Sequence, residues 1–329
     1  MEQKQGYQAS LKSIETEDWL DLHVIRPLCY QIACLFAKFD IHPNTVTIWS
    51  MIIGVISAYF FAQTSFYYNG TTGLLINLIG IILLMWADIF DCVDGQLARL
   101  TGKKSPIGRI LDGMAGFVWF IPIYLCIVYR FYLHHDIEFS LLGIDNNEQN
   151  TLIATGIVLI LSFISGFQGM GGQQRVADYY IQVHLLFLKG EEGSELDHSE
   201  IQRQKLKDLQ EKKASWAEIA FQKSYIDYTI KQEVATPEFQ NFVSVATQKY
   251  GGIGNIPSDI REEFHRESLA LIKWNGLLTF NFRAAFFFMF CLLDVPALNF
   301  VWEIVGMGLL TAYIQHRHEA FSKRLAAKL

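Results

Sequence analysis

The stretch DIFDCVDGQLARLTGKKSPIGRILDGMAG, residues 88–116, directly follows the apolar segment TTGLLINLIGIILLMWA, residues 71–87. No Lys or Arg occurs between Phe39 and Ala98. A membrane-spanning helix needs about 20 mostly apolar residues, and this segment has that character. Acidic side chains at the end of such a helix are costly unless a cation or another polar group accompanies them. The positions of Asp88, Asp91 and Asp94 therefore indicate a site at the membrane edge.

The composition of the whole chain is typical of a membrane protein. Of its 329 residues, 51% are hydrophobic and only 18% are charged, whereas about a quarter are charged in an average soluble domain. The N-terminal residues lack the basic region and apolar core that mark a secretory signal. The net charge of −6 does not favour nucleic-acid binding. No two of the five cysteines have the spacing of a metal site or redox motif, so we expect reduced thiols.

The distribution of apolar residues predicts an all-α integral membrane protein with six transmembrane helices. Their approximate bounds are Val46–Thr64, Gly73–Asp94, Ile107–Tyr129, Leu152–Met170, Leu271–Leu293 and Ala297–Ile314. The chain is thereby divided into an N-terminal segment (residues 1–44), the first four helices with the acidic stretch (45–188), a polar insert (189–265), and the last two helices with a basic tail (266–329).

Two segments outside these helices are also expected to be helical. Between Leu20 and Thr45, apolar residues recur at helical spacing around Arg26 and Lys38. This pattern predicts an amphipathic helix, which either lies on the membrane surface or packs as an ordinary helix. The insert Lys189–His265 is rich in Glu, Lys and Gln, which are good helix formers. Its role is open between a lid, a partner surface and a decoration.

The basic residues predict the orientation in the membrane. The loop between the second and third expected helices holds Arg99, Lys103, Lys104 and Arg109, and the C-terminal tail is basic as well. The opposite loops carry no Lys or Arg, apart from Arg130 at the edge of the third helix. By the positive-inside rule, both termini, the acidic stretch and the insert are expected in the cytoplasm. In a bacterium, the membrane would be the inner membrane.

The acidic residues are spaced so that they can act together. On a helix, Asp88, Asp91 and Asp94 share one face, and Gly95 leaves room for a group that approaches closely. If the next helix pairs with this one as an antiparallel hairpin, Asp112 joins them. Carboxylates crowded in a low dielectric repel one another unless a cation lies among them, and oxygen ligands suit Mg²⁺, Mn²⁺ or Ca²⁺. The residues alone therefore predict a metal-assisted phosphate site.

The sequence DCVDGQLARLTGKKSPIGRILD resembles the signature of the CDP-alcohol phosphotransferase (CDP-alcohol phosphatidyltransferase) family. That signature reads D-x-x-D-G-x-x-A-R, eight residues, then G-x-x-x-D-x-x-x-D. The positions that match are Asp91, Asp94, Gly95, Ala98, Arg99, Gly108 and Asp112. The stretch HPNTVT, residues 42–47, is similar to the Pro-Asn-x-x-Thr sequence that precedes the family's first span.

The resemblance implies transfer of a phosphatidyl or phosphoalcohol group from a CDP-linked donor to an alcohol, with release of CMP, in phospholipid or sphingolipid synthesis. Asp91, Asp94 and Asp112 would hold Mg²⁺ or Mn²⁺. The nucleotide and diphosphate would lie against Gly95, Ala98, Arg99, Lys103 and Gly108. The donor would be CDP-diacylglycerol or, with the parts reversed, a CDP-headgroup whose acceptor is a lipid alcohol. Membrane lipids and a second copy of the chain, in a homodimer, are the other expected partners.

One position departs from the signature, because Gly116 replaces its last Asp. By resemblance, that Asp is a metal ligand and the presumed base that deprotonates the acceptor. Another group could substitute, with Asp88 first and Asp178 or His184 behind it. Alternatively, the acceptor needs no protein base, or the protein binds a nucleotide-lipid without catalysis, as a binding protein or partner subunit.

Other polar residues carry weaker signals. Gln174 and Arg175, beside Gln168 and Gln173 at the end of the fourth expected helix, could contact the acceptor, although an interface anchor explains Arg175 equally well. An intramembrane Arg is a functional candidate by default, so Arg283, near Asn275 and Asn281, either acts in function or pairs with Glu303. We expect His316 and His318 to be solvated rather than ligands.

Overall fold

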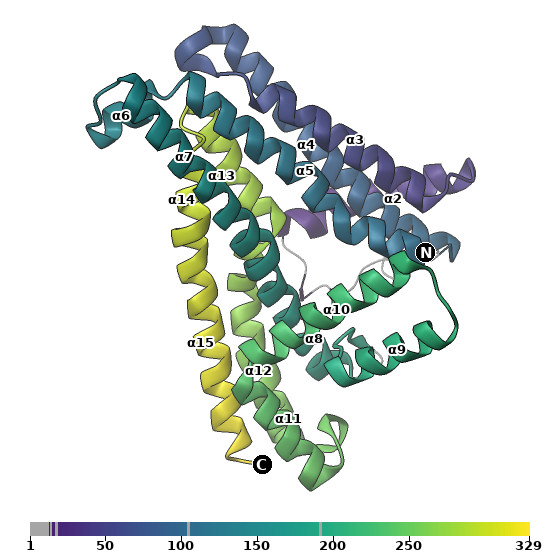
Figure 1. The fold of residues 1–329 in the computed structure, drawn as a ribbon. Helices are drawn as coiled ribbons and strands as arrows, with labels where there is room; N and C mark the ends of the chain where they lie inside the picture. The colour runs from purple at the N-terminus through teal and green to yellow at the C-terminus, as the bar shows by residue number, and fades with distance from the viewer. Residues whose placement is uncertain (1–12, 14, 17–18, 104–105, 191–192) are drawn as a thin grey trace. The chain divides into compact units, whose positions relative to one another are not determined.

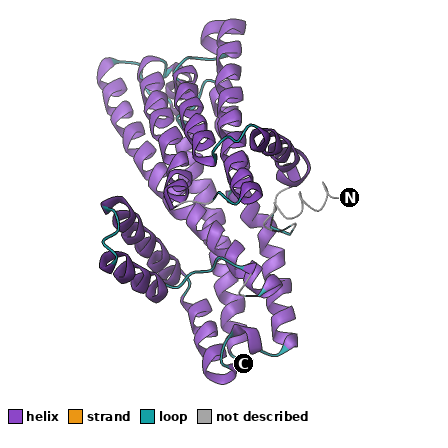
Figure 2. Cartoon of the chain, turned by 90° about the vertical axis from the view of Figure 1, so that its right-hand side faces the viewer, coloured by secondary structure: helices purple, strands orange, loops and turns teal. Residues whose placement is uncertain are grey.

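The computed structural model describes residues 13, 15–16, 19–103, 106–190 and 193–329, apart from the side chains of residues 106–107, 109–110, 112–113 and 170. Every regular element in this part of the chain is a helix, and it contains no strand (Figure 2). The expected all-α fold is thus confirmed.

Figure 1 labels the helices in chain order, and η denotes short π or 3₁₀ segments. The bounds are η1 Asp21–Ile25, α2 Arg26–Lys38, α3 Pro43–Phe61, α4 Phe66–Thr101, α5 Pro106–Leu133, α6 Asp136–Leu142, α7 Glu148–Ser165, η2 Gly166–Gln173, α8 Gln174–Lys189, α9 Ser199–Glu211, α10 Trp216–Ala235, α11 Pro237–Tyr250, η4 Ile253–Asn255, α12 Ser258–Asn275, η5 Gly276–Leu278, α13 Phe280–Leu292, α14 Leu298–Val301, η6 Trp302–Gly306 and α15 Met307–Ala326.

Five helical runs in the described residues are long and apolar enough to cross a membrane. They are Pro43–Phe61, Phe66–Thr101, Met114–Leu133, Glu148–Lys189 and Ser258–Leu292, and they overlap the first five expected helices. The sixth, Ala297–Ile314, falls on α14, η6 and the start of α15 and is not among them. The polar residues Asn299 and Glu303 interrupt its apolar character. The expected count of six is therefore not confirmed.

The chain forms two compact units, which are described separately. Unit 1 comprises Met1–Gly171 and Phe280–Met307, and unit 2 comprises Gly172–Thr279 and Gly308–Leu329.

In unit 1, α3 packs against both α4 and α5, and α2 packs against α4 (Figure 1). Helix α3 begins at the stretch HPNTVT. The His42 ring caps it by accepting a hydrogen bond from Asn44 N at 3.2 Å, and Pro43 occupies the first turn, where no N–H is needed. Helices α3 and α5 approach closely at Gly54, where a Cβ atom would lie 2.3 Å from the Trp119 ring.

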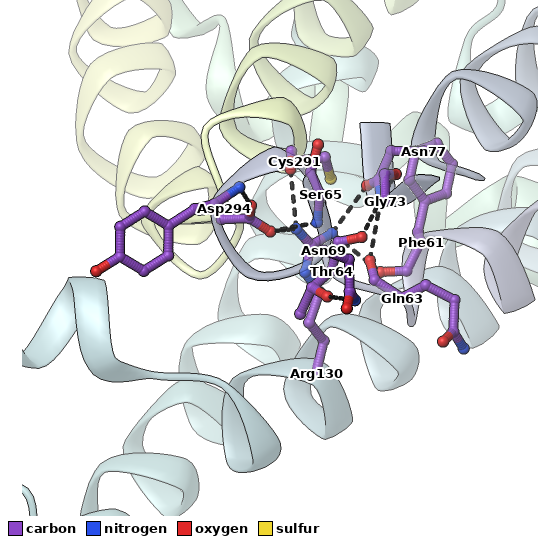
Figure 3. A network of polar contacts seen from close by, with 11 residues as sticks. Phe61, Gln63, Thr64, Ser65, Asn69, Gly73, Asn77, Arg130, Cys291 and Asp294 are labelled. Atoms are coloured by element: carbon purple, nitrogen blue, oxygen red, sulfur yellow. Dashed lines mark hydrogen bonds and ion pairs between the residues drawn. The ribbon is translucent and has the colours of Figure 1, made fainter. Parts of the chain in front are cut away.

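A buried polar network joins the ends of four helices of unit 1 (Figure 3). The Arg130 guanidinium, on α5, donates to the Asp294 carboxylate, to Asn77 Oδ1 (3.0 Å) and to Cys291 O (2.9 Å). Asp294 also accepts hydrogen bonds from Ser65 N (2.5 Å) and Tyr67 N (2.9 Å), at the start of α4. Because a buried charge must be paired and hydrogen-bonded, this network fixes the turns that connect the helices.

A second buried ion pair lies among the helices of unit 1. Arg283 Nη1, on α13, is 3.1 Å from Glu303 Oε1, on η6, and both side chains are only 1% exposed. Tyr124 Oη donates to Glu303 Oε2 at 2.6 Å, and Ser165 Oγ donates to the same oxygen. The pairing of Arg283 with Glu303, one of the two alternatives from the sequence, is confirmed.

The insert is helical, as expected, and belongs to unit 2. Helix α9 packs against α10, and α8 packs against α12. The Ser215 side chain begins α10 with a reciprocal capping box that involves Glu218. Aromatic rings fill the interior, among them Phe187 and Phe264, which stack with centroids 3.7 Å apart.

The prediction for the two C-terminal histidines is half right. His316 is exposed, but His318 is 1% exposed, so its predicted solvation is wrong. The His318 ring stacks on Tyr180 at 4.0 Å and meets the edges of Phe239 and Phe264. The two histidines are two residues apart on α15, so they point to nearly opposite sides of the helix.

Candidate active site

The acidic residues lie in the last turns of α4, after its apolar run. Asp88, Asp91 and Asp94 follow one another at three-residue spacing on the part of α4 that runs without a break after the kink at Gly70, so they share one face, as expected. Asp88 and Asp91 are half-buried, and Asp94 is 5% exposed. The helix ends at Gly102, whose φ of 69° is the left-handed conformation that glycine adopts without strain.

Asp94 is held by a threonine from the neighbouring helix. Thr47 Oγ1, on α3, lies 2.5 Å from Asp94 Oδ2 and 3.3 Å from Pro43 O. Thr47 is 2% exposed, so the hydroxyl satisfies one oxygen of a buried carboxylate. The sequence analysis related the stretch HPNTVT to the family but did not predict a role for Thr47. The contact links that stretch directly to the acidic face.

A cation from the N-terminal helix lies beside the same face. Arg26 Nη1, on α2, donates to Cys92 Sγ at 3.4 Å. Asp88 interacts electrostatically with both Arg26 and Asp21, and Asn281 Nδ2, on α13, donates to Asp21 Oδ1 at 2.9 Å. Sequence reasoning used Arg26 only as part of an amphipathic pattern and missed its position at the acids.

The residues expected at the nucleotide follow on α4. Gly95 leaves space that the Arg99 side chain approaches, since Arg99 Nη1 would be 3.5 Å from a Cβ atom at Gly95. Ala98 and Arg99 are half-buried. Lys103 Nζ lies 2.5 Å from Asp40 Oδ1 in an ion pair whose Asp40 side chain is 88% exposed. An exposed pair of this kind is weak, so it would exchange readily for a phosphate.

The second half of the signature lies on α5. Gly108 and Gly116 are half-buried on this helix, and the side chain of Asp112 lies outside the described residues. Helix α3 packs against both α4 and α5, the helices that carry the two halves of the signature. The convergence of Asp112 with Asp91 and Asp94 stays a prediction.

The donor atoms on α4 fit a hard divalent cation. Asp88, Asp91 and Asp94 offer only carboxylate oxygens, which Mg²⁺ and Mn²⁺ prefer. Asp94 is already oriented by Thr47, which is the support that ligating carboxylates usually have. The chemistry of these donors therefore suits the metal that the signature implies, although among the described residues the three carboxylates do not form a group whose oxygens all lie within 4.8 Å of one another.

The residues expected to contact the acceptor, and the two alternative bases, lie in unit 2. Gln174 and Arg175 begin α8, and Arg175 lines a small cavity with Val176, Tyr179, Tyr180, Gln232, Ala235 and Thr236. Asp178 Oδ2 accepts a hydrogen bond from Tyr228 Oη at 3.1 Å. His184 is fully buried, with Nδ1 2.7 Å from Ser268 Oγ. Both alternative bases thus have hydrogen-bond partners inside unit 2, whereas Asp88 lies in unit 1.

Five long apolar helices and a row of carboxylates at the end of one of them define a multi-pass membrane protein with an acidic site. Residues 40–165, which contain α3 to α7, match the model of the CDP-alcohol phosphatidyltransferase family. This match confirms the resemblance seen in the sequence for this part of the chain. The family transfers phosphoalcohol groups from CDP-alcohols in lipid synthesis and generally uses a divalent metal. No curated protein matches the chain.

Proposed function

We propose that the protein catalyses metal-dependent transfer of a phosphatidyl or phosphoalcohol group from a CDP-linked donor to an alcohol, with release of CMP. One observation carries the proposal. Within the matched domain, Asp88, Asp91 and Asp94 share a face of α4, and Thr47 orients the buried Asp94. Such carboxylates at the end of an apolar helix are costly unless they serve a cation.

The signature residues divide between metal and nucleotide. Asp91, Asp94 and Asp112 would hold Mg²⁺ or Mn²⁺. When bound, the metal neutralises the diphosphate and stabilises the departing CMP. Arg99, over Gly95, supplies positive charge for the diphosphate, and Ala98, Lys103 and Gly108 border the nucleotide. The position at the membrane edge lets a lipid tail stay in hydrocarbon.

Asp88 takes over part of the role lost at Gly116. It lies one helical turn before Asp91 on the same face and is half-buried. Arg26 lies in electrostatic range of Asp88. From there, Asp88 accepts the proton of the acceptor hydroxyl, as a general base must.

The acceptor is an alcohol that reaches the site from the cytoplasmic side. The reversed arrangement uses a CDP-headgroup donor and a diacylglycerol- or ceramide-like acceptor. The presence of Gly116 favours one further candidate function, a nucleotide-lipid binding protein or partner subunit without catalysis.

The role of Asp88 is tested with two substitutions and their combination. Asp88→Asn should lose CMP release while it keeps CDP-alcohol binding, because only the proton acceptor is removed. Restoring the signature acid in the double variant Asp88→Asn/Gly116→Asp should recover part of the rate. Both quantities are measured on the purified full chain in lipid. Normal turnover in Asp88→Asn would refute this assignment.

A further inference from the structure

The N-terminal helix α2 brings a cation to α4 that the proposed chemistry does not use. Arg26, the first residue of α2, is half-buried, and its Nη1 donates to Cys92 Sγ at 3.4 Å. A thiol sulfur is a weak acceptor, whereas a guanidinium has five N–H donors in a fork that suits phosphate oxygens. The contact therefore shows where the guanidinium lies on α4, and a phosphate oxygen would outcompete the sulfur as its acceptor.

The position of Cys92 on α4 puts Arg26 close to Gly95 and Arg99. Cys92, Gly95 and Arg99 follow one another at spacings of three and four residues on the unbroken part of α4, so they form one stripe. Arg99 Nη1 would lie 3.5 Å from a Cβ atom at Gly95. The stripe thus has a guanidinium on either side of the glycine, with Arg26 about one turn before it and Arg99 approaching from about one turn after it.

The packing of α2 on α4 holds the backbone of Arg26 in place. Gln96, which is fully buried, donates from Nε2 to Arg26 O at 3.4 Å. Cys29, about one turn farther along α2, is buried in one apolar cluster with Val93 and Leu97 of α4. Because the backbone is fixed here, a ligand that contacts the guanidinium has to order only one side chain, which lowers the entropic cost of binding.

We propose that Arg26 and Arg99 together bind the diphosphate of the CDP-linked donor over Gly95, which makes Arg26 a donor-binding residue outside the signature. This inference deepens the proposed function and rests on it. Gly95 is half-buried and has no side chain, so a phosphate can approach the α4 backbone closely. Two guanidinium groups match the two phosphates of the donor in number and in hydrogen-bond geometry.

The test measures binding of CDP in Mg²⁺ to the purified full chain in lipid, by isothermal titration calorimetry. Arg26→Met keeps an aliphatic side chain for packing and removes the guanidinium. Its Kd for CDP should rise by roughly 10- to 100-fold, as loss of a hydrogen bond to a charged group does. Arg26→Lys restores the charge without the fork and should recover part of the affinity.

The matched control is Lys38→Gln, which removes an exposed positive charge from the same helix and should bind CDP like the wild type. The unfolding temperature of each variant without nucleotide shows whether it is folded. If Arg26→Met does not fold, Arg26→Lys decides, since loss of the fork alone should still weaken CDP binding measurably.

Binding and turnover separate this inference from the proposed function. Unchanged CDP affinity in the folded Arg26 variants would overturn the inference, while CMP release by the wild type would leave the proposed function standing. An equal loss of affinity in Arg26→Met and Arg26→Lys would also overturn it, because packing would then explain the effect. If the wild type binds CDP but releases no CMP from any donor, the proposed function fails, and the arginines remain a diphosphate site of a binding protein. No binding of CDP to the wild type would overturn both.

Discussion

The carboxylate of Asp94 is oriented by a hydrogen bond within the protein, without any ligand. It is almost fully buried, so its carboxylate needs a donor, and Thr47 provides one at 2.5 Å. The donor comes from a different helix, which ties the direction of the carboxylate to the packing of α3 on α4. The stretch HPNTVT thereby contributes to the site as well as to the start of a helix.

Thr47→Val keeps the shape of the side chain and removes the hydroxyl. The buried carboxylate of Asp94 then loses this hydrogen bond, which costs about 1–3 kcal/mol of stability. We expect a rate at least about tenfold lower, since about 1.4 kcal/mol of lost transition-state stabilisation has this effect. Thermal unfolding and CMP release measure the two effects. Thr47→Ser, which keeps the hydroxyl, should behave like wild type, and a fully active, fully stable Thr47→Val would contradict the role given to this bond.

At this scale, the sequence predicts what depends on local spacing. Asp88, Asp91 and Asp94 are three residues apart, so a helix alone puts them on one face. The partners of this face and its neighbour Cys92 are distant in the chain: Thr47 is 47 residues from Asp94, and Arg26 is 66 residues from Cys92. Such contacts depend on how α2 and α3 pack on α4, which periodicity does not encode.

At the scale of the helix, buried polar residues were the hardest to interpret. Arg283 and Glu303 could be paired from sequence because each is a charge in an apolar segment, which needs a partner. The burial of His318 was missed, although its position on α15 relative to the exposed His316 is a helical property. Because the sequence of the tail is mostly polar, it did not indicate that one face of α15 is buried, where His318 stacks on Tyr180.

Burial lowers the pKa of His318 to about 3, from an ordinary value of 6.5. The folded protein thus keeps this ring neutral where the unfolded chain protonates it. The stability that depends on the neutral ring is fully present above pH 6.5 and is lost as the pH falls toward 3, by up to about 1.4 kcal/mol per pH unit. As the pH is lowered from roughly 7.5 to 5, the unfolding temperature of His318→Phe should therefore fall less steeply than that of the wild type. His316→Phe, on the exposed side, should leave that slope unchanged. Equal slopes in wild type and His318→Phe would show that this ring does not govern the effect.

For the whole molecule, composition and hydropathy predicted the class well and the details less well. An all-helical fold and five apolar helices agree with the expected membrane protein. The sixth expected helix is not among the runs that meet this criterion of length and composition, and two of its polar side chains, Asn299 and Glu303, are buried inside the protein. A hydropathy profile depends on composition alone and treats buried and exposed polar residues alike. It therefore predicts poorly whether such a segment crosses the membrane.

The sidedness of the chain is a prediction of the basic-residue pattern. Single cysteines introduced at Ser105 and at Lys212, in the α9–α10 connection, should be labelled from the same side of sealed vesicles. A cysteine at Asp145, in the exposed loop before α7, should be labelled only from the opposite side. The reagent is a membrane-impermeant maleimide, applied before and after permeabilisation. Labelling of the cysteines at positions 105 and 212 from opposite sides would contradict the prediction that the site and the insert lie on the same side of the membrane.

The most direct test of the central claim is the release of CMP. The purified full chain in lipid is mixed with CDP-diacylglycerol or with CDP-headgroup donors, each with a panel of alcohols, in Mg²⁺, in Mn²⁺ or in a chelator. The account predicts that one donor and acceptor pair gives CMP and the new lipid in equal amounts. It also predicts that the reaction stops without metal, and that Asp91→Asn lowers the rate by on the order of 100-fold or more, as removal of a key stabilising group does. Metal-dependent binding of a CDP-alcohol with no CMP release from any pair would contradict the account and identify a binding protein.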